Sequence, residues 1–179
     1  MATLSHDDAQ AAPPRIGVVA SRFHEEVCEG LLVGCLTRLE EAGADPASVE
    51  VIRVPGAFDI PFACRALADR GDCDALVALG CVVRGETAHF EYVAGECARG
   101  VMEAGMETGV PIAFGVLTTD TLEQARLRSD RTALVGSDAG QADKTALASN
   151  KGWEAAGAAL ELAEIVRMNG TASAPRREA

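Results

Sequence analysis

Residues 75–93 read ALVALGCVVRGETAHFEYV. The apolar run over residues 75–83 has the length and composition of a strand that is buried on both faces. It stops at Arg84-Gly85, and residues with helical spacing follow from His89. A helix N-terminus presents unpaired N–H groups and partial positive charge, so it favours anions. The segment therefore predicts a strand, a glycine turn and a helix, with a phosphate or oxyanion site and an imidazole at the turn.

The same alternation of strand and helix runs through the rest of the chain. Further strands are expected over residues 15–20, 49–54 and 110–117, and helices over residues 25–41, 58–69, 89–108, 121–128 and 149–168. Gly43 is expected to end the first helix, and Thr119 or Asp120 to cap the helix that starts at 121. The alternation predicts an α/β fold, a three-layer αβα sandwich with a flavodoxin-like, four-stranded parallel sheet and helices on both faces.

The chain has 179 residues, enough for one domain with a sizeable core. We expect that domain over residues 15–168. Residues 1–14 are polar and end in two prolines, and they predict a disordered arm. Residues 169–179 are also largely polar, and they predict a disordered tail.

Composition excludes several partners and compartments. The net charge of −11 argues against nucleic acid, whose phosphates require Lys and Arg surfaces, but it permits a small anion in a locally positive pocket. No apolar run is long enough to span a bilayer, and the N-terminus has no signal-peptide pattern. The six cysteines form no C-x-x-C pair, so we expect reduced thiols, no metal site and a cytoplasmic protein.

The site is expected where the carboxyl ends of the parallel strands meet. Phe23 and Phe58 follow strands in a chain with only 4% aromatic residues, so they either stack on a planar ligand or pack against a helix. Asp59 either accepts hydrogen bonds from a polyol or caps a helix start. His89 is a proton carrier or a surface residue, and Arg128 a phosphate ligand or a solvated cation at a helix C-terminus. The residues alone leave these alternatives open.

Five strings at these positions resemble one family. They are SRFH at 21–24, VPGAFDIP at 54–61, GCVVRGETAHFEYV at 80–93, PIAFGVLTT at 111–119 and NKG at 150–152. In this order and spacing they are similar to the 6,7-dimethyl-8-ribityllumazine synthases, over nearly the whole domain. The resemblance implies the penultimate step of riboflavin biosynthesis. A ribitylamino-substituted aminopyrimidinedione condenses with 3,4-dihydroxy-2-butanone 4-phosphate, with loss of phosphate and water and with no cofactor or metal.

The resemblance also implies roles for individual residues. His89 resembles the proton-transfer residue of the family. The implied phosphate ligands are Glu86, Thr87 and Arg128. The implied ligands of the pyrimidine, ribityl chain and ring are Phe23, Ala57, Phe58, Asp59, Cys81, Val82, Val83 and Phe114. Lys151 matches a lysine near the same site and is implied to bind substrate. In this family the active sites lie between the subunits of a homopentamer, so Phe114 and Arg128 would come from the neighbouring subunit.

Four positions depart from the commoner pattern of the family. Asp59 stands where glutamate is frequent, which predicts a shifted or water-bridged contact to the ribityl chain. His24 stands where asparagine is frequent. Glu86 places a carboxylate beside the implied phosphate, so its side chain is expected to turn away. Cys81 replaces a small residue, which predicts sensitivity to oxidation or alkylation.

Twenty-two residues separate Arg128 from Lys151. This connection, a loop insertion over residues 129–149, is longer than in members that assemble into sixty-subunit shells. Since the connection lies near the contacts between pentamers in the family, we expect free pentamers or a pair of pentamers. The insertion also leaves Arg126 and Arg131 as alternatives to Arg128.

Two other functions fit the same fold. The first is an archaeal-type riboflavin synthase, which would dismutate two lumazines. The second is a catalytically weak carrier of flavin or lumazine. A generic flavodoxin-like binding domain is the remaining alternative. Turnover with the two substrates distinguishes a lumazine synthase from a carrier, and formation of riboflavin from lumazine identifies the riboflavin synthase.

Overall fold

The computed structural model describes residues 13–130 and 149–169. The arm predicted over residues 1–14, the insertion over 129–149 and the tail over 169–179 lie almost entirely outside these residues. Within the described ranges no helix is long and apolar enough to cross a membrane.

Four parallel strands form one sheet in the order β2-β1-β3-β4. Their bounds are Ile16–Ser21 for β1, Val51–Val54 for β2, Ala75–Val83 for β3 and Ile112–Thr119 for β4. The predicted fold class is confirmed. The last strand continues to Thr119, two residues beyond its predicted end, because Thr119 still pairs with Val83.

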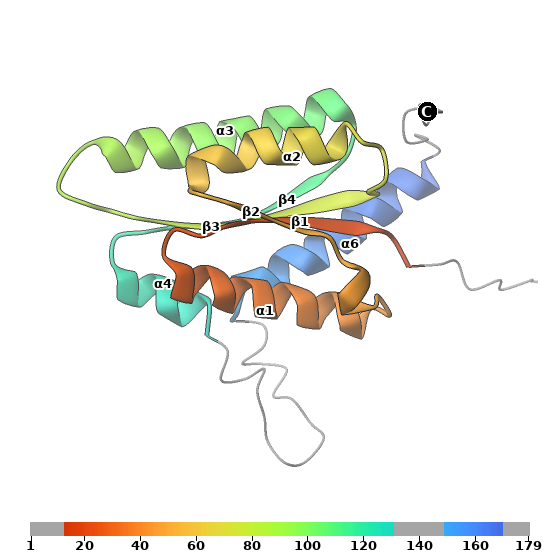
Figure 1. Ribbon diagram of the computed structural model, residues 1–179, viewed down its shortest axis with the longest axis horizontal. Helices are drawn as coiled ribbons and strands as arrows, with labels where there is room; N and C mark the ends of the chain where they lie inside the picture. Colours follow the sequence, from red (N-terminus) through yellow and green to blue (C-terminus); the bar gives the residue numbers. More distant parts are fainter. Residues whose placement is uncertain (1–12, 131–148, 170–179) are drawn as a thin grey trace, which may run out of the picture.

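Helices cover both faces of the sheet and complete three layers (Figure 1). One face carries α1 (Glu25–Glu41), α4 (Leu122–Arg128) and α6 (Lys151–Met168). The other carries α2 (Ile60–Ala68) and α3 (His89–Thr108). Two short 3₁₀ turns, η1 (Pro46–Ser48) and η2 (Ala57–Asp59), precede β2 and α2.

The central strand β3 is apolar throughout because both of its faces are covered. Val77 and Leu79 belong to the core cluster beneath α1 and α6, whereas Leu76 and Ala78 belong to the cluster beneath α2 and α3. All four side chains are fully buried. This explains why the segment shows no polar alternation.

The ends of two helices test the capping predictions. Gly43 follows α1 with φ +89°, as expected for a glycine that ends a helix. The prediction of Thr119 or Asp120 as the cap of α4 is wrong, since the Thr121 hydroxyl accepts the Gln124 N–H at 3.2 Å. Thr119 instead donates to the carbonyl of Thr121, and Asp120 pairs with Arg84.

Candidate active site

A cavity opens where the carboxyl ends of the strands meet. From β1 the chain continues to β2 at one edge of the sheet, whereas from β3 it continues to β4 at the opposite edge. The boundary between β1 and β3 is therefore a topological switch point. A hollow of about 770 Å³ lies there, which we call the strand-end hollow. Eight of its lining residues were predicted as site residues, namely Phe23, Ala57, Phe58, Cys81, Val82, Val83, Thr87 and His89.

The turn after β1 holds Phe23 outward. Its N–H donates to the Ser21 hydroxyl at 3.1 Å, and its carbonyl accepts from the Cys28 thiol at 3.1 Å. His24 adopts φ +56°, a left-handed conformation in which asparagine and histidine are enriched. The two rings meet edge to face at 4.7 Å between centroids. Phe23 is 63% exposed, so its ring is available to a ligand rather than packed on a helix.

The turn after β2 is closed by Asp59. Its Oδ2 atom accepts the Gly56 N–H at 2.9 Å, which braces η2 at the start of α2. Asp59 is exposed and does not line the strand-end hollow. Asp59 therefore acts as a helix-start residue through its Oδ2 atom. Phe58, in the same turn, is 60% exposed and lines the hollow.

Arg84 fixes the turn between β3 and α3. Its N–H donates to the Thr119 carbonyl at 2.9 Å, and its guanidinium pairs with Glu91 on α3 and with Asp120 after β4. The guanidinium also lies 4.2 Å from the centroid of the Phe90 ring. Hydrogen bonding to Glu91, and then to Asp120, raises the pKa of Arg84, and the same pairing lowers the pKa of Glu91. The first turn of α3 is thereby tied to the sheet edge.

His89 begins α3, and its N–H donates to the Thr87 hydroxyl at 3.4 Å. This contact leaves the Thr87 O–H free to donate to another acceptor. His89 is exposed at the hollow, within reach of a ligand. Glu86 is also exposed but is not among the residues that line the hollow.

The Cys81 thiol is buried beneath the hollow, with 1% of the residue exposed. Burial raises the pKa of this thiol to about 11. A thiol that is neutral and inaccessible reacts poorly with oxidants and alkylating agents. The structure therefore argues against the sensitivity predicted from sequence.

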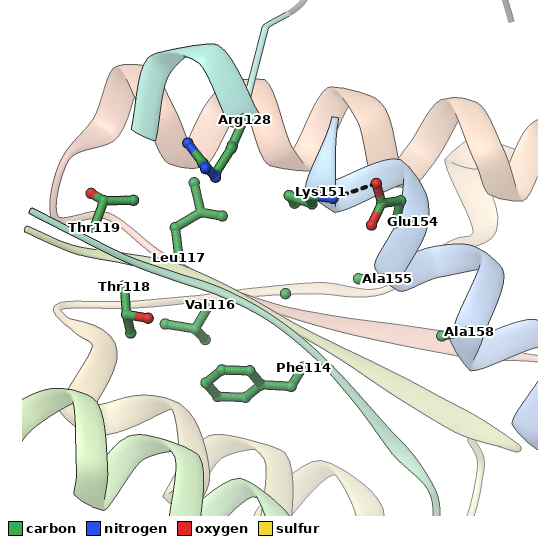
Figure 2. Close-up of a pocket in the computed structure, with 11 residues that line it drawn as sticks. Phe114, Val116, Leu117, Thr118, Thr119, Arg128, Lys151, Glu154, Ala155 and Ala158 are labelled. Atoms are coloured by element: carbon green, nitrogen blue, oxygen red, sulfur yellow. Dashed lines mark hydrogen bonds and ion pairs between the residues drawn. The ribbon is translucent and has the colours of Figure 1, made fainter. Parts of the chain in front are cut away.

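A second hollow of about 410 Å³, the edge hollow, lies along β4. It contains three further predicted residues, Phe114, Arg128 and Lys151 (Figure 2), whereas Asp59 and Glu86 line neither hollow. β4 is an edge strand, and Phe114 on it is 43% exposed. Lys151 Nζ pairs with Glu154 Oε1 at 2.5 Å. Two cations and one carboxylate thus lie on the α4 and α6 side of β4, whereas the exposed Phe114 ring lies on the opposite side of this strand (Figure 2).

Of the two described candidates Arg126 and Arg128, Arg128 lines the edge hollow. Its Nη1 atom donates to the Gln124 carbonyl at 2.9 Å, within the same helix. Arg126 instead pairs with Glu26 of α1 at 3.0 Å. Arg131 lies outside the described residues.

Comparison with known proteins identifies the family. The family model described as 6,7-dimethyl-8-ribityllumazine synthase matches residues 13–167. A curated protein of that name from Syntrophus aciditrophicus (strain SB) is 42% identical over 167 residues, which cover 93% of this chain and 99% of the relative. The chain belongs to the 6,7-dimethyl-8-ribityllumazine synthase family. The resemblance inferred from the five strings is confirmed.

The two hollows share no lining residue, so the residues that the family resemblance assigns to one site are divided in this chain. Sequence reasoning did not assign a site role to several residues that line them. These are His24, Phe90 and Tyr92 in the strand-end hollow and Glu154 in the edge hollow. For Phe90 and Tyr92, the position in the first turn of a helix after a ligand-binding loop was an available signal. In the described ranges no cluster of His, Cys, Asp or Glu is suited to hold a metal ion.

Proposed function

We propose that this protein condenses 5-amino-6-(D-ribitylamino)uracil with 3,4-dihydroxy-2-butanone 4-phosphate to 6,7-dimethyl-8-ribityllumazine, releasing phosphate and water. Membership of the family supports the reaction. The observation that carries the assignment of the site is the strand-end hollow. It combines two exposed aromatic rings with His89 and Thr87 at a helix N-terminus.

In the proposed site, Phe23 and Phe58 flank the pyrimidine, and the backbone of Cys81, Val82 and Val83 hydrogen-bonds its edge. Ala57 allows the ribityl chain to approach the turn after β2. The second oxygen of Asp59 accepts from a ribityl hydroxyl at the rim of the hollow. The 63% and 60% exposure of the two phenylalanines supports this role, since most of each ring is left uncovered by residues 13–130 and 149–169.

The phosphate of the four-carbon substrate binds at the start of α3. Thr87 and the N–H groups at Glu86 and Thr87 supply hydrogen bonds, and Arg128 supplies the balancing charge. His89 transfers protons during imine formation, phosphate elimination and ring closure, each of which moves a proton. Stabilisation of the departing phosphate and the proximity of two bound substrates supply the remaining rate enhancement.

We further propose that each active site joins the strand-end hollow of one subunit to the edge hollow of the next, in a homopentamer. The division of the site residues between two hollows supports this arrangement. An exposed edge strand such as β4 is also a surface that proteins generally cover. The assembly is a free pentamer or a pair of pentamers. Six free, buried cysteines support a reducing, cytoplasmic location.

Mixed assemblies test both parts of the proposal. One variant, Phe58→Ala/His89→Ala, disables the strand-end hollow, and the other, Arg128→Ala/Lys151→Ala, disables the edge hollow. Co-expressed, they should form lumazine faster than either variant alone, because some interfaces then combine two intact hollows. Activity that never exceeds the mean of the two parents would contradict a shared site. A wild-type protein that binds lumazine without forming it would identify a carrier.

A further inference from the structure

Asn150 caps α6 and is completely buried. Its Oδ1 atom accepts the N–H groups of Gly152 at 2.9 Å and Trp153 at 3.2 Å, which is an ordinary N-cap. Its Nδ2 atom donates to two carbonyls of other segments, Gly30 of α1 at 3.1 Å and Asp130 after α4 at 3.0 Å. All four hydrogen bonds that an amide side chain offers are therefore made.

Capping alone does not require this side chain. Serine, threonine and aspartate cap helices about as well, but none of them combines an acceptor with two N–H donors. The Nδ2 contacts reach residues 120 and 20 positions away in sequence. They join the start of α6 to the end of α4 across the backbone of α1.

Three glycines show how tightly these segments meet. A Cβ atom on Gly30 would lie 2.1 Å from the Ser129 carbonyl oxygen, and one on Gly34 would lie 2.2 Å from Asn150 Oδ1. A Cβ atom on Gly152 would lie 1.9 Å from the Leu31 carbonyl oxygen. The end of α4 and the start of α6 therefore contact α1 directly, and neither can move closer to it.

The joined segments carry the two cations of the edge hollow. Arg128 precedes the tied residue Asp130 by two positions, and Lys151 directly follows Asn150. Figure 2 shows that both cations lie at this hollow, on α4 and on the first turn of α6. The separation of these two side chains therefore depends on the bond between Asn150 and Asp130.

We propose that Asn150 is a positioning residue for phosphate binding: its amide holds Arg128, next to Lys151, where the phosphate of the substrate binds. The inference rests on the proposed role of the edge hollow in phosphate binding. Asn150 does not touch the substrate. It acts through the backbone carbonyls that its Nδ2 atom binds.

Asn150→Ser tests this directly, since serine keeps the cap acceptor but removes both amide donors. We expect the KM for the butanone phosphate to rise roughly tenfold, and by a larger factor than the KM for the pyrimidine, because a misplaced Arg128 loses most of its charge-assisted contact with the phosphate. Asn150→Thr, which also keeps a cap acceptor without the amide donors and adds no charge, should act in the same direction if the serine variant folds poorly. Leu67→Ala, a buried residue of α2 on the opposite face of the sheet, is the control for a general loss of stability.

Combination with Arg128→Ala separates positioning from structure. If Asn150 acts through Arg128, Asn150→Ser should raise the KM for the butanone phosphate by a smaller factor in the Arg128→Ala background than in the wild type. The proposal would be overturned if Asn150→Ser raised this KM by the same factor in both backgrounds. It would also be overturned if Asn150→Ser left the KM for the butanone phosphate unchanged. If Arg128→Ala by itself leaves that KM unchanged, the proposed phosphate role of Arg128 fails, and the positioning role fails with it.

Discussion

Arg126 and Arg128 lie two residues apart on α4 but contact different parts of the molecule. Arg126 pairs with Glu26 of α1 at 3.0 Å, whereas Arg128 lines the edge hollow beside Lys151. Sequence reasoning left both as candidates for phosphate binding. In the structure the ion pair to α1 accounts for Arg126, and Arg128 is available for an anion.

Arg128→Ala should therefore lower kcat/KM for the butanone phosphate by about 10- to 100-fold, the usual effect of losing a charge-assisted hydrogen bond. Steady-state kinetics with the butanone phosphate varied would measure it. Arg126→Ala is the matched control, with activity near wild type. A larger loss in Arg126→Ala than in Arg128→Ala would reverse the assignment.

His89→Ala should slow lumazine formation by about 100-fold without abolishing it, because a proton carrier supplies only part of the rate and proximity supplies the rest. Absorbance of the lumazine chromophore would follow the rate above the uncatalysed background. Lumazine binding should remain close to wild type. A folded, lumazine-binding variant with no turnover at all would show that His89 is indispensable.

Wild-type protein should resist inactivation by iodoacetamide near pH 8. The thiol of Cys81 is buried and its pKa is about 11, so little thiolate is present. Mass spectrometry should detect labelling of Cys81 after denaturation but not before it. Rapid inactivation that Cys81→Ala prevents would instead support the sensitivity predicted from sequence.

Gly152→Ala should destabilise the fold by about 3 kcal/mol, because its Cβ atom would overlap the Leu31 carbonyl. Gly95→Ala on α3 is the opposite control, since its Cβ atom would meet nothing within 4 Å. Alanine should stabilise that helix by about 0.5–1 kcal/mol. Chemical denaturation of both variants would measure the difference, and similar stabilities would contradict the close contact between α6 and α1.

Asp74 should contribute to stability at neutral pH and lose that contribution in acid. Its burial alone would raise its pKa, but hydrogen bonds from the side chain and N–H of Arg15 outweigh this effect and lower it. A carboxylate with a lowered folded pKa stabilises the fold above its unfolded value of 3.8 and stops doing so as the pH falls through the folded pKa. Asp74→Asn should therefore be less stable than wild type at pH 7. The difference in stability between the two proteins should be smaller near pH 3, and thermal unfolding at both pH values would measure it.

Hydrophobic periodicity was sufficient to predict α1 and α3, whose observed bounds equal the predicted ones, and β3 likewise. Contacts between distant residues were not predictable in this way. The predicted helix over residues 58–69 begins as a 3₁₀ turn because Asp59 bonds back to Gly56, and it becomes α-helical only at Ile60. The bonds from Asn150 to Gly30 and from Arg126 to Glu26 join residues 120 and 100 positions apart, and no local pattern indicates them.

The bond from Asn150 to Asp130 also makes the two ends of the intervening segment neighbours in space. Since the entropic cost of closing a loop grows only with the logarithm of its length, residues can be added between these ends at little cost to stability. The added chain would leave Arg128 and Lys151 in place, because Arg128 precedes Asp130 and Lys151 follows Asn150, so neither lies between the two bonded residues. This position is therefore suited to carrying a guest peptide, such as an affinity tag or an epitope, on an active enzyme.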